Sequence, residues 1–423
     1  MSARFSLSPQ SRAMLGRIGT IVLLAVTALY VGLIGTELVQ QAQHWPVLHR
    51  ERDFPSYYLA AQRLLRGEDF YSGLKEGALS LGIEDYFIDA AVTPPTFAVT
   101  LAPLALFPYP VAWGIWQILS VAALVLSLWL VLRQKQCSLS PLGWARLGCA
   151  VLLFPPLTFH LLYAHTELFL LLLLAGGWYS LRRRREIAGG VLLGMAGAIR
   201  IYPLFLLIFL IQRRAWKALL AALAAGLGLA AVAALAAGPS SYLGYVDVLG
   251  AEVSTLYARW GNFSLYGDVH KLASIWPALG QQPLVRDLLA ILLSLGTLIL
   301  TLLLTWKRRS AARSIDRDYG LFTVATLLAS PLSWIYYQVL LYLPLLFLLD
   351  TLRRNRGPRA IPWILAAALL ASLCPIVEGQ PGLPLALKQL LAFFPTLTLA
   401  GVYVALVMAA PDAAQCPCRN QGS

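Results

Sequence analysis

Long apolar segments separated by short basic clusters recur along the whole chain. Six of these segments approach the length of about 20 residues that a helix needs to cross a bilayer: 18–34, 110–132, 216–237, 288–306, 361–377 and 387–409. Of the 423 residues, 59% are hydrophobic and only 13% carry a charge, a composition typical of polytopic membrane proteins. The pattern predicts an all-α bundle in a membrane. The first segment lacks a small-residue cleavage site, so no removable signal peptide is expected.

Basic residues concentrate at the ends of the apolar segments. The clusters are Arg12 and Arg17, Arg133 and Lys135, Arg182 to Arg185, Arg213 and Arg214, Lys307 to Arg309, and Arg353 to Arg359. By the positive-inside rule they mark the cytoplasmic side, together with both termini, and they predict about twelve transmembrane helices. The net charge of +13 is then explained by topology and by attraction to anionic lipid. Membrane lipids are therefore predicted partners, and nucleic acid is not.

Three stretches begin and end at basic residues, so each is predicted to be a hairpin whose tip faces outside. The polar tips are His165–Thr166–Glu167, the segment from Arg200 to Pro203, and the segment from Ser330 to Tyr337. Their arms are short, and short broken helices are tolerated where their ends are buried in protein or line a cavity. The tips are expected to emerge on one external face.

The chain is predicted to form a single integral membrane domain over residues 1–423. A first external loop, 38–109, carries an amphipathic juxtamembrane helix at 57–67 and a short apolar or re-entrant piece that starts at Pro94. A second external loop spans 238–283, and a cytoplasmic tail spans 411–423. The tail contains Cys416 and Cys418, and the five cysteines have no spacing typical of a disulfide framework or a zinc site.

Asp53 is the most informative single residue, because it lies in a charged motif directly after the first span of a very apolar chain. One interpretation is a solvated loop acid or an ion-pair partner of Arg52. The other is a general base that accepts a proton from an acceptor hydroxyl. Partial burial against Phe54 and Tyr57 would raise the pKa of such a base, and a nearby arginine would oppose that.

Arg200 has apolar sequence on both sides, which makes an unpaired guanidinium costly. The side chain either extends to the interface from a helix end or binds a phosphate, for which its fork of donors is well shaped. Tyr202 adds a hydroxyl donor beside it.

The remaining polar candidates point to substrate contacts rather than to a metal. His165 and Glu167 have no third ligand at a suitable spacing, so hydrogen bonding to a polar substrate is favoured and no metal is predicted. Asn262 and Ser264 are either loop-turn residues or sugar contacts. No glycine-rich phosphate loop is present, so a nucleotide site is not indicated and no cofactor is expected.

Three aromatic side chains near the third tip also allow two interpretations. Trp334, Tyr336 and Tyr337 fit an interfacial aromatic belt. At the mouth of an active site the same rings would stack on a sugar. The sequence supports both.

Taken in order, these motifs resemble glycosyltransferase family 87, which includes polyprenol-phosphate-mannose-dependent α-1,2-mannosyltransferases of the GT-C superfamily. The resemblance rests on 52–54, 57–61, 64–71, Pro94–Pro95, 167–174, 194–203, 261–265 and 330–334. It implies a GT-C-like bundle, Asp53 as catalytic base, and Arg200, where lysine is common, as the phosphate contact. The chain departs from the family at His165–Thr166–Glu167, where a Gly-Gln-x-Asn-like tip is usual. It departs again at Tyr336 and Tyr337, where an acid and histidines are usual.

The function implied is an inverting transfer of a hexose, with mannose as the expected sugar, from a polyprenyl phosphate to a hydroxyl of a glycolipid or glycan. The site would face the exterior, or periplasm, of a bacterial inner membrane. Two alternatives belong to other classes. One is a lipid or glycan transporter or flippase with a site at mid-depth between repeats. The other is a catalytically silent relative that binds glycolipid.

Overall fold

The computed structural model describes residues 9–43, 53–83, 92–137, 139–259, 261–306, 315–353, 360–373, 382 and 384–409. Regular structure in these residues is helical, apart from one isolated antiparallel bridge between Asn262 and Trp334. Glu51, Arg52, Cys416, Cys418 and the predicted tail 411–423 lie outside the described residues.

The helices of the first half, in chain order, are α1 (Pro9–Gln43), α2 (Asp53–Leu65), α3 (Leu74–Ser80), α4 (Pro95–Leu101), η1 (Leu104–Leu106), α5 (Tyr109–Gln134), α6 (Pro141–Leu152), α7 (Pro155–Tyr163), α8 (Glu167–Arg182) and α9 (Glu186–Ile199). Those of the second half are η2 (Tyr202–Leu204), α10 (Phe205–Gln212), α11 (Trp216–Ala237), α12 (Ser240–Leu256), α13 (Leu265–Ile275), α14 (Pro277–Gly280), α15 (Pro283–Trp306), α16 (Ile315–Ala329), η3 (Ile335–Leu341), α17 (Tyr342–Arg353), α18 (Ile361–Ala371), α20 (Leu385–Leu391) and α21 (Phe394–Met408). Elements labelled η are 3-10 helices.

Six helical segments in the described part of the chain are long and apolar enough to cross a membrane: Arg17–Val39, Tyr109–Gln134, Trp216–Ala237, Pro283–Trp306, Ile335–Leu352 and Leu387–Met408. The pair α6 and α7, bent by 53°, makes a seventh if it is one span. The predicted all-α polytopic character is confirmed. The predicted total of about twelve crossings stays a prediction.

Helix breaks occur where the polar tips of the three hairpins were expected. Helix α7 ends at Tyr163 and α8 begins at Glu167, so His165 lies in the turn between them. Helix α9 ends at Ile199 before η2, and α16 ends at Ala329 before η3. By contrast, residues 238–283, expected as a polar loop, are built largely from α12, α13 and α14.

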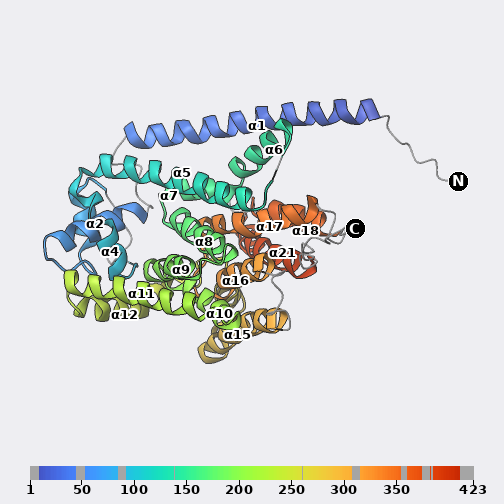
Figure 1. Ribbon diagram of the computed structural model, residues 1–423. Helices are drawn as coiled ribbons and strands as arrows, with labels where there is room; N and C mark the ends of the chain where they lie inside the picture. The colour runs from blue at the N-terminus through green and yellow to red at the C-terminus, as the bar shows by residue number, and fades with distance from the viewer. Residues whose placement is uncertain are drawn as a thin grey trace, which may run out of the picture.

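The helices that follow the first span gather at one end of the molecule. Helices α2 and α4 pack against each other there, beside α11 and α12, whereas α17, α18 and α21 lie towards the other end (Figure 1). Helix α1 runs along the outside of the bundle and packs chiefly on α6 (Figure 1). The predicted juxtamembrane helix is therefore present as α2, but its residues Phe54 to Ala61 are buried against protein.

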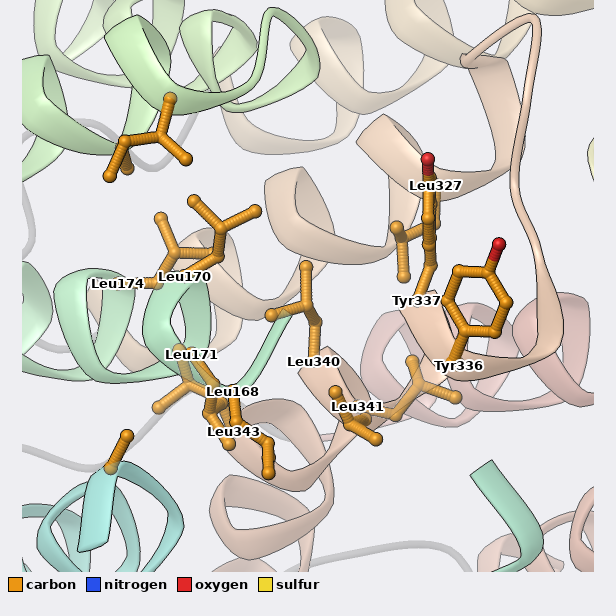
Figure 2. Close-up of a cluster of buried hydrophobic side chains, with 14 of the residues drawn as sticks. Leu168, Leu170, Leu171, Leu174, Leu327, Tyr336, Tyr337, Leu340, Leu341 and Leu343 are labelled. Carbon is orange, nitrogen blue, oxygen red and sulfur yellow. The ribbon is translucent and has the colours of Figure 1, made fainter. Parts of the chain in front are cut away.

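Leucines form the core between the middle helices. Figure 2 shows side chains of α8 facing those of η3 and the start of α17, with Tyr336 and Tyr337 at the edge of the same cluster. Leu168, Leu170 and Leu341 in this cluster have no exposed surface. This packing anchors the start of α8 and the start of η3, which both carry candidate site residues.

Small residues hold α9 tightly against α11. A Cβ added at Gly190 would lie 2.0 Å from the carbonyl oxygen of Ala218, and one at Gly194 would lie 2.1 Å from that of Ala222. Glycines four residues apart lie on one helix face and let two backbones approach closely, as in membrane helix pairs. The contact fixes α9, and so determines where Arg200 emerges from its C-terminal end.

Candidate active site

Helix ends, turns and short 3-10 helices bring seven of the predicted residues together. Asp53 is the first residue of α2, His165 and Glu167 lie at the α7–α8 turn, and Arg200 follows α9. Tyr202 lies in η2, and Tyr336 and Tyr337 lie in η3. The contacts described below connect all seven.

Asp53 is a largely buried acid beside a cation. Its side chain is 23% exposed, and its Oδ2 atom lies 3.5 Å from His165 Nε2. Burial raises the pKa of Asp53 from its ordinary 3.8 to about 7, although Arg200 and the Tyr336 hydroxyl act to lower it. Burial and a nearby arginine are the two opposing influences that the sequence predicts for Asp53.

A strained turn places His165. Ala164 follows the last residue of α7 and has a left-handed backbone (φ 52°, ψ 50°), an uncommon conformation for a residue other than glycine. The carbonyl of Ala164 accepts a hydrogen bond from Trp116 Nε1 at 2.9 Å. At the start of α8, the backbone N–H of Leu168 donates to His160 Nε2 at 3.1 Å, which satisfies one free donor of the helix end.

Glu167 has no exposed surface and accepts hydrogen bonds from its neighbours. His165 Nδ1 is hydrogen-bonded to its Oε2 atom, Thr166 Oγ1 donates to the same atom at 3.1 Å, and Tyr202 Oη donates to Oε1 at 3.3 Å. Arg200 Nε lies 3.9 Å from Oε1. A buried carboxylate with this many donors is well satisfied.

Arg200 is the cation of the site, and its residue is only 9% exposed. Its Nη2 atom donates to Tyr57 Oη at 2.9 Å and to His165 Nε2 at 3.2 Å, and its Nε donates to Thr166 Oγ1 at 3.3 Å. Its Nη1 reaches the carbonyl of Val92 at 3.5 Å. The guanidinium is thus held inside the site rather than extended to an interface.

Aromatic rings form one wall. The ring of Tyr336 lies 4.0 Å from that of His165 between centroids, and the ring of Tyr337 stacks on Tyr202 at 5.4 Å. Trp334 is stacked on Tyr336 at 6.5 Å and is partly exposed. Tyr336 and Tyr337 are buried, so these two rings belong to the site rather than to an aromatic belt facing lipid.

Asn262 and Ser264 are occupied by contacts within the protein. Asn262 Oδ1 accepts from the backbone N–H of Ser333 at 2.9 Å and from Ser264 Oγ at 3.0 Å. Asn262 Nδ2 donates to the carbonyls of Pro331 and Tyr257 at 2.9 and 3.2 Å. These contacts clamp the start of α13 to the turn before η3 and agree with the loop-turn interpretation. Sugar contacts by the two side chains stay a prediction.

Tyr57 and Thr166 bind the guanidinium of Arg200 and were not singled out from the sequence. Tyr57 lies one turn after Asp53 on α2, so the i, i+4 spacing is the one signal that pairs them. Thr166 lies between two named candidates. In the part of the chain that the structure describes, no group of three or more His, Cys, Asp or Glu side chains is arranged to hold a metal ion.

The geometry combines a base with a cation. The pKa of Asp53, about 7, is close to neutral pH, which suits proton transfer from a hydroxyl. Arg200 offers several donors, and part of its surface is exposed to an incoming group. Such a pair suits a reaction in which a hydroxyl loses a proton while a negatively charged group departs.

Comparison with known proteins then decides the family. Residues 92–331 match the model of glycosyltransferase family 87. The chain belongs to glycosyltransferase family 87. The described residues alone contain six helical segments that are long and apolar enough to cross a membrane, so it is an integral membrane protein of a glycosyltransferase family.

A relative from Mycolicibacterium smegmatis is 27% identical over 282 residues. It is a polyprenol-phosphate-mannose-dependent alpha-(1-2)-phosphatidylinositol pentamannoside mannosyltransferase. The match spans 64% of this chain and 64% of the relative. No solved structure matches the chain.

The family segment contains only some of the site. His165, Glu167, Arg200, Tyr202, Asn262 and Ser264 lie inside residues 92–331, whereas Asp53, Trp334, Tyr336 and Tyr337 lie outside. Asp53 contacts the family segment in three dimensions, where its Oδ2 atom lies 3.5 Å from His165 Nε2.

Proposed function

We propose that this protein transfers mannose from a polyprenyl phosphate to a hydroxyl of a glycolipid or glycan, with inversion at the anomeric carbon. Family membership supports glycosyl transfer, and the mycobacterial relative's name supports a polyprenol-phosphate-mannose donor. The basic clusters at the cytoplasmic ends of the spans support a site on the external face.

The observation that carries the proposal is the placement of Asp53 and Arg200 in one buried site. Arg200 is close enough to influence the protonation of Asp53 electrostatically, and both contact His165. In the reaction, the acceptor hydroxyl gives its proton to Asp53 and its oxygen attacks C1 of the sugar. The bond from C1 to the phosphate oxygen breaks, and the phosphate leaves with the electron pair beside Arg200 and Tyr202.

Positioning and charge stabilisation supply most of the acceleration in this scheme, because a lipid phosphate is already a fair leaving group. Tyr336 and Tyr337 then provide surfaces on which the sugar stacks. Trp334 extends this wall towards the exposed side of the site.

The donor class is tested with purified protein in liposomes that contain a membrane glycolipid fraction as acceptor. Radiolabelled polyprenyl-phosphate-mannose is compared with a nucleotide-linked mannose of the same specific activity. The proposal predicts label in the glycolipid from the lipid-linked donor alone. Label from the nucleotide sugar, or passage of intact labelled lipid across the bilayer without transfer, would overturn it.

A further inference from the structure

The carboxylate of Asp53 faces a second acid across one imidazole ring. Asp53 Oδ2 is buried and has no hydrogen-bond partner among the described residues, and it lies 3.5 Å from His165 Nε2. The other ring nitrogen, Nδ1, is hydrogen-bonded to Glu167. His165 and Glu167 are 2% and 0% exposed at their side chains. Asp53, His165 and Glu167 thus form a line with the imidazole in the middle.

The hydrogen bonds around Glu167 determine where the proton of the imidazole lies. Thr166 and Tyr202 both donate to Glu167, so this carboxylate acts as an acceptor and His165 Nδ1 must be the donor. Nε2 then carries a lone pair, and Arg200 Nη2 donates to it at 3.2 Å. His165 is therefore a neutral ring whose Nε2 lone pair accepts from Arg200 and faces Asp53.

This proton arrangement explains why Asp53 Oδ2 makes no hydrogen bond. An ionised carboxylate and the lone pair of Nε2 are both acceptors, so the contact at 3.5 Å is unproductive while Asp53 lacks a proton. Once Asp53 has taken a proton, its new O–H group faces an acceptor at that same position. The contact becomes productive at the point in the reaction when the base is loaded.

We propose that His165 and Glu167 form a proton relay behind Asp53: the proton that Asp53 takes from the acceptor hydroxyl passes to His165 Nε2, and the resulting imidazolium is stabilised by Glu167. The inference rests on the proposed function. The O–H bond of protonated Asp53 breaks, an N–H bond forms at Nε2, and Asp53 returns to its ionised state. His165 and Glu167 act through Asp53 and are positioning residues.

Arg200 couples this relay to the donor. The Nη2 atom of Arg200 donates to His165 Nε2, the same atom that Asp53 faces. The positive charge of Arg200 opposes protonation of the ring. A phosphate bound at the guanidinium offsets that charge and competes for Nη2, which frees the lone pair for Asp53. Burial, Arg200 and His160 hold the pKa of His165 well below its ordinary 6.5, so the ring is neutral at the start of the cycle and takes the proton from Asp53 only after the bound phosphate has offset the charge of Arg200.

The charged and titratable groups that face Asp53 and His165 come from every element around them: Tyr57 from α2, His160 from α7, Glu167 from α8, Arg200 and Tyr202 from the α9–η2 junction, and Tyr336 and Tyr337 from η3. Two of these neighbours are charged: Arg200 carries a positive charge and Glu167 carries a negative charge. A structural role alone would make His165 a packing residue against Tyr336. The pH dependence of the rate separates the two roles.

The test uses Glu167→Gln in the liposome assay with labelled polyprenyl-phosphate-mannose. Glutamine keeps the volume but removes the negative charge behind His165, so the imidazolium of the relay is no longer stabilised. Loss of a nearby negative charge also lowers the pKa of Asp53, so the rising limb of the rate against pH shifts to lower pH. The relay predicts this shift together with a fall of about a hundred-fold in kcat and little change in donor binding.

Three further variants distinguish the relay from a loss of folding: His165→Asn, its combination with Glu167→Gln, and a matched control. His165→Asn combined with Glu167→Gln should be no slower than His165→Asn alone, because members of one relay do not act additively. The matched control is His270→Asn, which removes another buried histidine whose Nε2 lies 3.4 Å from a carboxylate, that of Asp287. The control should retain wild-type kcat and pH profile.

The outcomes distinguish the two proposals. If the wild type transfers mannose and Asp53→Asn does not, while Glu167→Gln keeps the wild-type pH profile, the relay is wrong and the proposed function stands. An equal loss at every pH, with additive effects of the two substitutions, also contradicts the relay. A wild type that transfers no mannose overturns the proposed function and, with it, the relay.

Discussion

Among single residues, Asp53 combines two properties that rarely occur together, burial and closeness to a cation that does not form an ion pair with it. Its Oδ2 atom is buried, and the guanidinium of Arg200 is engaged with Tyr57, Thr166 and His165. Desolvation therefore outweighs the attraction of the arginine, and the carboxyl has a raised pKa. A carboxyl whose pKa is about 7 suits the general-base role that is proposed for Asp53.

The first prediction concerns the pH dependence of transfer. A general base acts only when it is ionised, so kcat/KM should rise with pH and level off above a midpoint near the pKa of Asp53, about 7. Stability changes in the opposite direction, because the folded protein binds the proton more tightly than the unfolded chain. The contribution of Asp53 to stability is present below pH 4 and is lost as the pH rises to about 7.

Rates measured between pH 5 and 9 with the lipid-linked donor check this prediction. Glu68→Gln is the control, since Glu68 is an exposed acid of the same segment that pairs with Arg63. A profile that is flat across this range in the wild type would contradict the assigned role of Asp53.

The sequence was informative about the acids and the arginine because charge is scarce in an apolar chain and therefore conspicuous. It was uninformative about Tyr57 and Thr166, because both accept hydrogen bonds from Arg200, which lies 143 residues after Tyr57 and 34 residues after Thr166 in the sequence. It was also ambiguous for Asn262, because an amide can satisfy its own loop or a sugar equally well. Only the contacts to Ser333 and Pro331 show that the loop uses it.

At the scale of elements, the site depends on how closely α9 approaches α11. The end of α9 supplies Arg200, and Thr96 of α4 donates a hydrogen bond to the carbonyl of Ala198 in the last turn of this helix. Displacement of α9 along or away from α11 would therefore move the cation of the site.

The second prediction is that Gly190→Ala destabilises the protein and impairs donor binding. The added methyl group would lie 2.0 Å from the carbonyl oxygen of Ala218, so the helices must separate. Overpacking of this kind costs about 1–3 kcal/mol, and it displaces Arg200. Thermal unfolding in detergent and the donor KM measure the two effects.

Gly228→Ala in α11 is the matched control. Nothing lies within 4 Å of a Cβ at that position, so the same substitution should leave stability and KM close to wild type. Equal behaviour of the two variants would show that the close contact does not determine the position of Arg200.

The prediction of elements from sequence succeeded where apolar runs are long and failed where they are interrupted. Residues 216–237 were predicted with the bounds that α11 has. Residues 240–256 form α12 although Gly244, Asp247 and Gly250 interrupt the apolar pattern that was used to recognise spans. Helix α12 is supported by tertiary contacts, such as Tyr71 against Gly244, that no local pattern displays.

At the scale of the whole molecule, a second charged cluster ties the helices together at a distance from the site. Lys135 donates hydrogen bonds to Asp316 and, at 3.1 Å, to Asp350. Trp178 Nε1 and Arg182 also contact Asp316, at 2.9 and 3.2 Å. These residues lie on α8, α16, α17 and just after α5, so one cluster connects four helical segments.

The third prediction is that Lys135→Met destabilises the bundle without altering the chemistry. Removal of the cation leaves Asp316 and Asp350 buried with less compensation, which costs about 3–5 kcal/mol in comparable buried pairs. The melting temperature should fall, whereas the pH profile of the remaining folded enzyme should match the wild type. Lys217→Met is the control, because Lys217 is exposed and its loss should cost less than about 0.5 kcal/mol.

Whether Asp53 is the catalytic base is shown by transfer of labelled mannose from polyprenyl phosphate by the wild type, Asp53→Asn and Glu68→Gln at equal amounts of folded protein. Asparagine keeps the shape of Asp53 but cannot accept the proton. We expect Asp53→Asn to lower the rate by about a hundred- to ten-thousand-fold, while Glu68→Gln stays at the wild-type rate. Equal transfer by the wild type and Asp53→Asn would contradict the claim that Asp53 is the catalytic base.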